Sequence, residues 1–299
     1  MKTSSHSFCQ VFAAVVVLVS LFSLPAQADY IYVSSGDKIL KFDSSGNSTI
    51  FASDINGGGS GKLAFDKNGS LYMLTGNTIS KFDSNGQSSF FVSTLNMNAF
   101  DLAFDSSNNL YVSVDNLQMR YDEGMIVKYD SSGNMSTFAT GALAARSITL
   151  DNSDNLYISN TAKGTIEKFD IYGNRSTFAS GIYVLGPLAF HSAGNLFVSV
   201  WPTTGNGMII KFDTSGNNSI FASGIEASSL AFDSSDNLYA ISGSTRENSS
   251  IVKFDSNGNM SIFATDLQAG ACGIAIIPEP ATLAFLSLGG LALLGRKRK

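Results

Sequence analysis

The sequence repeats itself six times between residues 30 and 277, and this repetition restricts the possible folds more than any other feature. Each unit contains four short segments suited to β-strands, which we name A (Leu-Ala-Phe-Asp), B (Asn-Leu-Tyr-Val), C (Ile-x-Lys-Phe-Asp) and D (Ser-x-Phe-Ala). The strand C lysines stand 40, 47, 40, 43 and 42 residues apart, at Lys41, Lys81, Lys128, Lys168, Lys211 and Lys253. Repeats of this length with four strands each are typical of a β-propeller.

The residues between strands support hairpins at fixed places in every unit. A turn followed by a bulge needs one residue with positive φ, which glycine adopts without strain and Asn or Asp tolerate. The turn after strand C contains Gly46, Gly86, Gly133, Gly173, Gly216 and Gly258. The turn after strand A contains Gly69, Asn108, Asp154, Gly194 and Asp236.

The two ends of the repeat region predict how the ring closes. The region opens with strands B, C and D at residues 30–33, 39–43 and 48–52, and it ends with a strand A at 273–277. We therefore predict an all-β, six-bladed propeller over residues 29–277, in which the last strand pairs with the first and leaves no open edge. The strand D aromatics should form the core between blades; they are Phe51, Phe91, Phe138, Phe178, Phe221 and Phe263.

The repeat unit resembles a known family. The stretch from Leu230 to Ala264, with its Leu-Ala-Phe-Asp, Asn-Leu-Tyr-Ala and Ile-Val-Lys-Phe-Asp steps, is similar to NHL repeats, whose units build six-bladed propellers. The resemblance covers about residues 30–277 and implies the same ring fold.

Residues 1–28 have the pattern of a secretory signal peptide. Lys2 precedes the apolar run 11–24, and Ala26 and Ala28 form a small-residue site for signal peptidase. Cleavage there makes Asp29 the first residue of the mature chain. The alternative is a membrane anchor that is kept.

Residues 278–299 form a second targeting segment. Pro278, Glu279 and Pro280 precede an apolar stretch at 281–295, and a basic end follows at Arg296–Lys299. The stretch spans about 22 Å as a helix, less than the roughly 30 Å hydrocarbon core, so it suits transient insertion with the cations in the cytoplasm. The segment closely resembles the PEP-CTERM sorting tail, which implies processing by the membrane enzyme exosortase, release or attachment at the cell surface, and an association with exopolysaccharide. A simple tail anchor is the alternative.

Composition excludes several classes of function. Outside the two targeting segments, 1–28 and 278–299, the chain has 14 of its 19 basic residues and 23 of its 24 acidic ones, which gives a net charge of −9. A body this acidic argues against nucleic acid as a partner. With Cys9 in the signal segment, Cys272 has no partner for an intrachain disulfide.

The longer, irregular connections join strands D to A and B to C, and they belong to one face of the ring, where we expect any ligand. Candidate ligand-binding residues there are Lys62, Asp101 and Arg146, at or beside the start of strand A, and Trp201, which could stack on a sugar or cap its blade. We assign no catalytic residues, because no acid–base pair is recognisable, and no metal or cofactor, although six-bladed propellers include calcium-dependent lactonases. The single mature histidine, His191, occupies an Asp position in a turn on the opposite face.

These observations favour an exported, surface-sorted, non-catalytic propeller that binds extracellular polysaccharide or surface proteins. A secreted lactonase or lyase-like enzyme is the second hypothesis, and a purely structural surface protein is the third.

Overall fold

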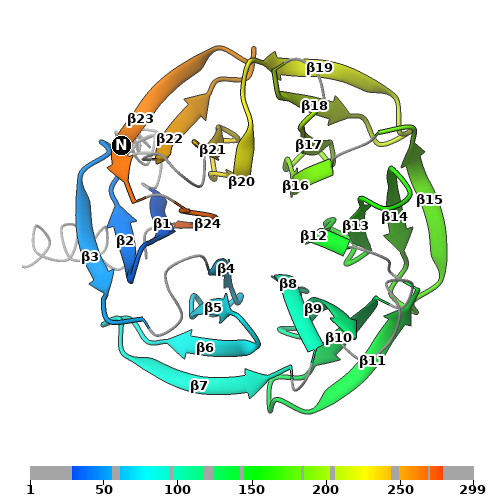
Figure 1. Ribbon diagram of the computed structural model, residues 1–299, viewed down its shortest axis with the longest axis horizontal. Coiled ribbons are helices and arrows are strands. Elements are labelled where there is room, and N and C mark those ends of the chain that lie inside the picture. The colour runs from blue at the N-terminus through cyan, green and yellow to red at the C-terminus, as the bar shows by residue number, and fades with distance from the viewer. Residues whose placement is uncertain are drawn as a thin grey trace, which may run out of the picture.

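The computed structural model describes residues 29–55, 61–94, 97–116, 124–141, 145–182, 185–202, 206–243, 249–268 and 270–278, which form a closed ring (Figure 1). The regular structure of these residues consists of 24 strands in six antiparallel, four-stranded sheets. This confirms the predicted all-β, six-bladed propeller. Within the same residues, no helix is long and apolar enough to cross a membrane.

Each blade runs from strand A beside the central channel to strand D at the rim. Blade 1 comprises β24 (Gly273–Pro278), β1 (Asp29–Ser35), β2 (Lys38–Phe42) and β3 (Ser48–Ala52). Blade 2 comprises β4 (Lys62–Phe65), β5 (Leu71–Thr75), β6 (Thr78–Phe82) and β7 (Ser88–Ser93), and blade 3 comprises β8 (Met97–Phe104), β9 (Leu110–Asn116), β10 (Met125–Tyr129) and β11 (Met135–Thr140). Blade 4 comprises β12 (Ala145–Leu150), β13 (Leu156–Asn160), β14 (Thr165–Phe169) and β15 (Arg175–Ser180). Blade 5 comprises β16 (Leu185–Phe190), β17 (Leu196–Val200), β18 (Met208–Phe212) and β19 (Asn218–Ser223), and blade 6 comprises β20 (Ala227–Phe232), β21 (Leu238–Ser242), β22 (Ser249–Phe254) and β23 (Met260–Leu267).

The ring closes as predicted, by pairing of the last strand with the first. β24 lies antiparallel to β1, with a register that runs from Ser34 opposite Gly273 to Asp29 opposite Pro278. The closing strand is one residue longer than predicted, because Pro278 still faces Asp29. A proline fits there because it ends a strand at the channel edge, where no further ladder partner needs its missing N–H.

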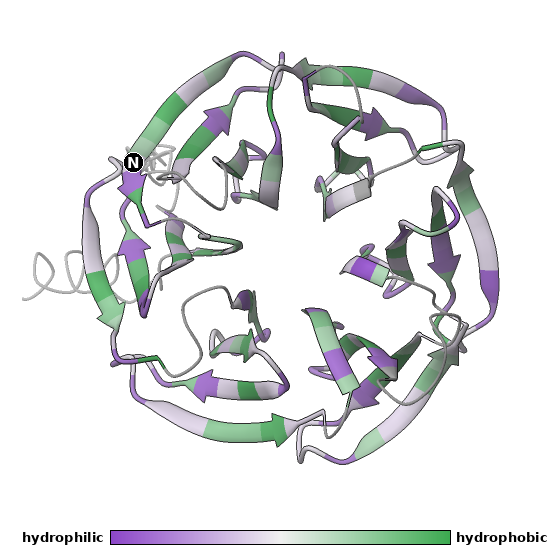
Figure 2. Ribbon diagram, in the orientation of Figure 1, coloured by the Kyte–Doolittle hydropathy of each residue, from purple (hydrophilic) through white to green (hydrophobic). Residues whose placement is uncertain are grey.

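Apolar side chains fill the space between neighbouring blades. Six buried clusters occur, one for each pair of adjacent blades, including the pair formed by blades 6 and 1. Figure 2 shows apolar bands on all layers of the blades, as expected for sheets that are covered on both faces. The strand D phenylalanines pack against these clusters, as predicted; Phe51, for example, meets Tyr32 of its own blade edge-on and Phe82 of the next blade.

The turn glycines are required twice over. All eleven turn residues predicted to have positive φ do so, with values of 59–84°. In the C–D turns the glycine also lies against the previous blade: a Cβ on Gly86 would stand 1.8 Å from the Phe51 carbonyl oxygen, and one on Gly258 would stand 2.3 Å from that of Phe221. At these two junctions the strand D of one blade and the C–D turn of the next therefore fit only without a side chain. Figure 1 shows these outer strands following one another around the rim.

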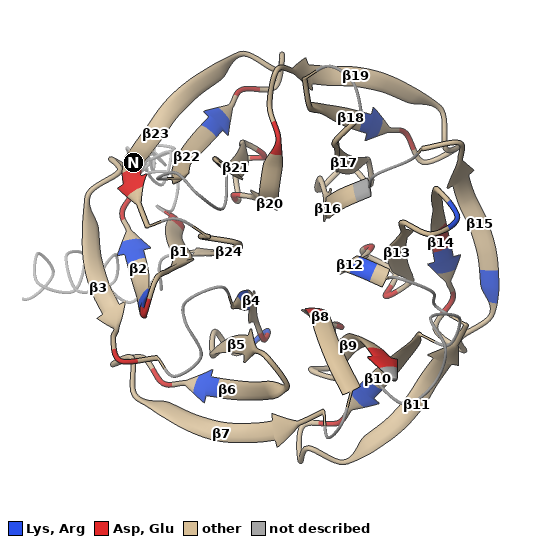
Figure 3. Ribbon diagram, viewed as in Figure 1, with Lys and Arg blue, Asp and Glu red and all other residues tan. Residues whose placement is uncertain are grey.

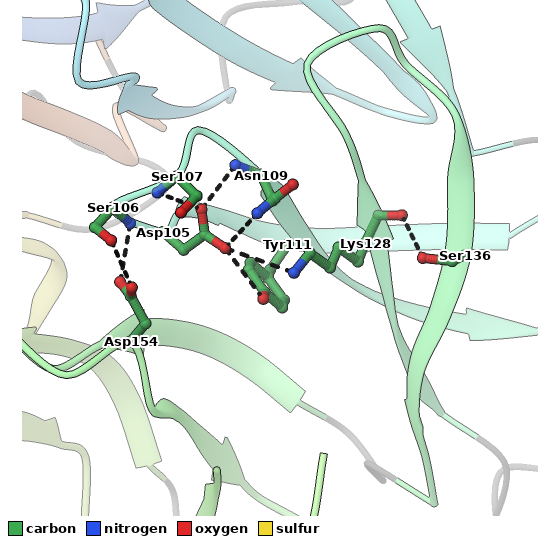
Figure 4. Close-up of polar contacts among 8 residues, drawn as sticks. All are labelled: Asp105, Ser106, Ser107, Asn109, Tyr111, Lys128, Ser136 and Asp154. Atoms are coloured by element: carbon green, nitrogen blue, oxygen red, sulfur yellow. Dashed lines mark hydrogen bonds and ion pairs between the residues drawn. The ribbon is translucent and has the colours of Figure 1, made fainter. Parts of the chain in front are cut away.

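The turns between strands A and B tie the blades together on the short-turn face (Figure 4). The Asp105 carboxylate accepts hydrogen bonds from the backbone N–H groups of Ser107 and Asn109 and lies 3.6 Å from the Lys128 ammonium. The neighbouring Ser106 donates its N–H and hydroxyl to Asp154 of the next blade, at 2.9 and 2.6 Å. The acidic turns of this face therefore form structural contacts within and between blades.

The strand C lysines lie over aromatic rings of strand B. Lys128 stands 5.0 Å from the centre of the Tyr111 ring, and Lys168 and Lys253 stand 5.1 and 5.2 Å from Tyr157 and Tyr239. Figure 3 shows these basic segments on the third strand of the blades. Because their stems cover the rings, these lysines contribute to packing as well as to solubility.

Candidate functional site at the channel mouth

The inner strands surround a cavity of about 300 Å³ at the centre of the ring. Its upper level, towards the face with the longer connections, contains Lys62, Asp101, Ser147, Pro187 and Ser229, and deeper levels contain Leu, Ala and Phe side chains of strand A. We call the upper level the channel mouth. The structure thus brings two of the four predicted residues, Lys62 and Asp101, to the wall of one cavity.

Bulges interrupt the inner strands at the channel mouth in four consecutive blades. The pairing register shifts between Ala99 and Asp101 in β8, and between Ala145 and Ile148 in β12. β16 and β20 shift at equivalent places. The inner strands therefore begin before the residues that we expected to precede them, because a bulge breaks the alternation by which a strand is recognised.

The Asp101 carboxylate serves as a hydrogen-bond acceptor for the backbone of two blades. One oxygen accepts from the N–H of Leu102 and the other from the N–H of Ile148 in blade 4, each at 3.0 Å. Burial raises the pKa of Asp101, although the charge of Lys62 and these hydrogen bonds oppose the shift. Asp101 thus joins blades 3 and 4.

Equivalent residues join other blades in the same way. The Ser147 hydroxyl accepts from the N–H of Leu188 in blade 5, at 3.1 Å, and the Ser229 hydroxyl accepts from the N–H of Ile274 in blade 1, at 3.3 Å. The sequence contains a signal for this role that we missed, since three units carry a short acceptor side chain at one position.

Lys62 reaches around the channel mouth to two other blades. Its ammonium donates to the carbonyl oxygen of Cys272, at 3.0 Å, and to that of Ser228 in blade 6, at 3.2 Å. Burial raises the pKa of the Cys272 thiol, so this cysteine remains protonated at neutral pH.

Arg146 lies beside the channel mouth instead of in the wall of the cavity. It is exposed, and its guanidinium carbon stands 5.4 Å from the centre of the Phe100 ring. Its positive charge also acts on Asp115: burial raises the pKa of Asp115, and the charge of Arg146 opposes this rise. Sequence reasoning missed Phe100 and Asp115, since neither stands at a repeated polar position.

Trp201 lies on the same face in blade 5. Its indole N–H donates to the Ser199 hydroxyl at 3.1 Å, and the ring lies against Gly186, where a Cβ would be 3.5 Å from the indole. The half-buried ring therefore covers the bulge of β16. Its predicted part in ligand binding stays a prediction.

The described residues at the channel mouth do not fit a calcium ion. Calcium takes six to eight oxygen ligands. Asp101 is the one carboxylate lining the described cavity, both its oxygens already accept hydrogen bonds, and the Lys62 charge acts on it. Nor does the described part of the chain contain a group of three or more His, Cys, Asp and Glu residues placed to hold a metal.

A second buried polar cluster occurs within blade 4. Glu167, 1% exposed, occupies a strand C position where blades 3 and 6 have Val127 and Val252. One of its oxygens accepts from Asn160 and Thr165 and pairs with Arg175, while the other has no partner in the described structure. Arg175 also donates to the Gly141 carbonyl of blade 3, so the cluster joins two blades.

His191 functions as a turn residue. Its Nδ1 accepts from the N–H of Ala193 at 3.0 Å, the bond that an aspartate oxygen accepts in the equivalent turns. Its Nε2 stands 3.7 Å from the Asp236 carboxylate of blade 6. His191 lies on the face opposite the channel mouth, as its place in the A–B turn requires.

The fold and the tail together define an exported six-bladed propeller that carries a sorting signal. Residues 277–299 match the family model of the PEP-CTERM protein-sorting motif. This motif indicates export, processing by exosortase and a membrane-associated location at the cell surface. The tail beyond Pro278 and the predicted signal segment 1–28 lie outside the described residues.

Solved structures with similar folds belong to different kinds of protein. A protein of unknown function from Bacteroides caccae matches with a TM-score of 0.58 and 12% identity, over 84% of this chain and 100% of that one. A streptogramin B lyase matches with a TM-score of 0.55 and 15% identity, over 85% and 88% of the two chains. Regucalcin from Agrobacterium tumefaciens, a calcium-binding protein, matches with a TM-score of 0.54 and 15% identity, over 80% and 84%. No curated protein matches the sequence. Identities this low show a shared fold.

Proposed function

We propose that the protein is a surface-sorted ring that binds extracellular polysaccharide without changing it chemically. In this scheme signal peptidase cuts after Ala28, within the Ala26–Ala28 site, and exosortase cuts near Pro278–Pro280 while the basic end from Arg296 stays in the cytoplasm. The membrane then holds the chain only transiently, through residues 281–295, and the binding domain is the ring that starts at Asp29.

One observation carries the proposal: both charged side chains in the cavity wall, Lys62 and Asp101, are hydrogen-bonded to backbone groups. A general acid or base needs a titratable side chain that is free to exchange a proton with the substrate. Asp101 accepts from two N–H groups, and Lys62 donates to two carbonyl groups. These bonds keep the mouth rigid and support recognition more than proton transfer.

The experiment is a binding measurement between the full chain, purified in mild detergent, and exopolysaccharide isolated from the same organism. We expect saturable binding, retained when Ser256, on the opposite face, is replaced by alanine, and weakened by Trp201→Ala, on the same face as the channel mouth. Absence of saturable binding would contradict the proposal. Saturable capture of a surface protein alone would point to a protein partner, and absence of any binding would favour a purely structural role.

A second candidate is a lyase or lactonase-like activity, favoured by the cavity of about 300 Å³ and by the similar folds of a lyase and a calcium-binding protein. It is tested with a panel of lactones and uronate-containing polysaccharides, with and without added calcium. Turnover that Asp101→Asn abolishes while the melting temperature is retained would establish it and would displace the binding proposal.

A further inference from the structure

We propose that Phe100, Arg146 and Asp115 form a subsite for a carboxylated sugar beside the channel mouth, an inference that rests on the proposed function. Phe100 and Arg146 occupy equivalent bulges in blades 3 and 4. A bulge leaves a residue unpaired and turns its side chain away from the regular alternation. In these two blades the bulges present an aromatic ring and a guanidinium to each other, whereas the shifts in blades 5 and 6 contain Gly186, Pro187 and Ser228.

The guanidinium of Arg146 is available to a ligand. Within the described residues it makes no hydrogen bond or ion pair of its own, and its contact is the face of the Phe100 ring at 5.4 Å. By contrast, Lys62 is bound to two carbonyl oxygens, and Arg175 is bound to Glu167 and Gly141. An exposed guanidinium held on an aromatic ring keeps its planar donors in a fixed orientation at little further entropic cost.

The three side chains match the chemistry of a uronic acid. A sugar carboxylate can take two parallel hydrogen bonds from a guanidinium, an arrangement that an ammonium or an amide cannot reproduce. The half-buried Phe100 ring offers an apolar surface to the C–H face of the sugar. Asp115, which pairs with Asn98 two residues before Phe100, offers acceptor oxygens to the hydroxyl groups of the sugar. A neutral sugar has no group that requires the cation.

The net negative charge of the ring means that an acidic polysaccharide can be bound only through local contacts. The ring carries a net charge of −9, so it does not attract a polyanion by its overall field. Affinity for an acidic polysaccharide must therefore depend on local contacts, and removing one cation should have a large effect.

The test uses the full chain in mild detergent and two probes of equal length, tetragalacturonate and cellotetraose, with affinities measured by calorimetry at low salt. We expect tighter binding of the uronate, and a loss of about tenfold or more in uronate affinity for Arg146→Gln, the effect of one charged hydrogen-bond pair. Arg146→Lys should recover only part of the affinity. Affinity for cellotetraose should be the same in all variants.

Lys163→Gln is the matched control, because Lys163 is an exposed cation of the same blade, in a connection on the same face. It should leave uronate affinity unchanged. Equal affinity of the unaltered chain for the two probes, or equal losses in Arg146→Gln and Lys163→Gln, would overturn the subsite while leaving the proposed binding of polysaccharide intact. Absence of binding to either probe and to the organism's own exopolysaccharide would overturn both.

Discussion

The Asp29 carboxylate accepts two hydrogen bonds from Ser234, one from the backbone N–H at 2.9 Å and one from the hydroxyl at 2.8 Å. Asp29 begins blade 1, and Ser234 lies in the A–B turn of blade 6. Asp154 and Asp236 take the same pair of bonds from Ser106 and Ser192 in continuous turns. The first residue of the ring thus takes the place of the A–B turn that blade 1 lacks, because its strands β24 and β1 come from opposite ends of the repeat region.

Replacing Ser234 by alanine should weaken the closure of the ring. The change removes one hydrogen bond to a charged acceptor on an exposed surface, so we expect a loss of about 1 kcal/mol in the free energy of unfolding. Urea denaturation of the purified chain measures the shift. Ser256→Ala, in an exposed C–D turn, is the control and should leave the midpoint unchanged; equal midpoints for both variants would show that the Asp29 contact contributes nothing.

Gly86→Ala should be far more damaging than Gly224→Ala. The two glycines have nearly equal φ values, 80° and 83°, so both alanine variants carry the same left-handed strain of roughly 1–2 kcal/mol. A Cβ on Gly86 would overlap the Phe51 carbonyl, whereas nothing lies within 4 Å of one on Gly224. We expect a further loss of about 1–3 kcal/mol for Gly86→Ala, seen as a lower urea midpoint. Similar midpoints for the two variants would exclude the close contact between blades.

The ring should lose stability in acid because of its C–D turns. The side-chain amide of the asparagine four residues on, together with backbone N–H groups, lowers the pKa of Asp43, Asp130, Asp170, Asp213 and Asp255 below 3.8. Because these pKa values are lower in the folded chain, the stabilisation is complete above about pH 4 and disappears as pH falls through the folded values. Unfolding midpoints measured from pH 6 to pH 2.5 should decline below pH 4.

Asn217→Ala tests the cause of the lowered pKa of Asp213 directly. It removes the amide that donates to Asp213 at 2.8 Å, so the pKa of Asp213 should rise towards its usual value in an NMR titration. The stability of this variant should decline less steeply in acid than that of the unaltered chain. An unchanged Asp213 titration would contradict the assigned cause.

Arg175→Ala should destabilise the ring more than the removal of both members of its ion pair. Arg175 is one-third exposed, but its loss leaves the buried Glu167 without a charged partner, which should cost about 3 kcal/mol or more. Combining it with Glu167→Val, the residue that blades 3 and 6 carry, should restore most of the stability. Thermal unfolding of the single and double variants compares them, and a double variant less stable than Arg175→Ala would show that Glu167 has another role.

The repeat predicted the ring and the turns, because these follow from local pattern, and it predicted the closing pair because the last unit supplies the strand A that the first unit lacks. Gly86 and Asn108 could be placed since a positive φ restricts the residue type at one position. The contact between Gly86 and the Phe51 carbonyl could not be foreseen, because it joins two blades at a distance that no pattern within one unit encodes.

The candidate site was only partly accessible to the same reasoning. Lys62 and Asp101 line the cavity, and their part in ligand binding stays a prediction. The hydrogen bonds of Asp101 depend on bulges that shift the backbone by one or two residues. Such bulges have no compositional signature when the extra residue is as different as Phe100 in one blade and Ser228 in another. Phe100 could therefore be identified only from its contact with Arg146 in the structure.

The pairing of Asp29 with Pro278 also determines how the ring bears mechanical load. The PEP-CTERM motif begins at residue 277, within β24, so no spacer separates the sorting tail from the ring. A pull on the tail would therefore act directly on the strand that six residue pairs join to β1. The strand that completes the ring thus also leads into the sorting tail, and a force on the tail would load the closing pair of strands first.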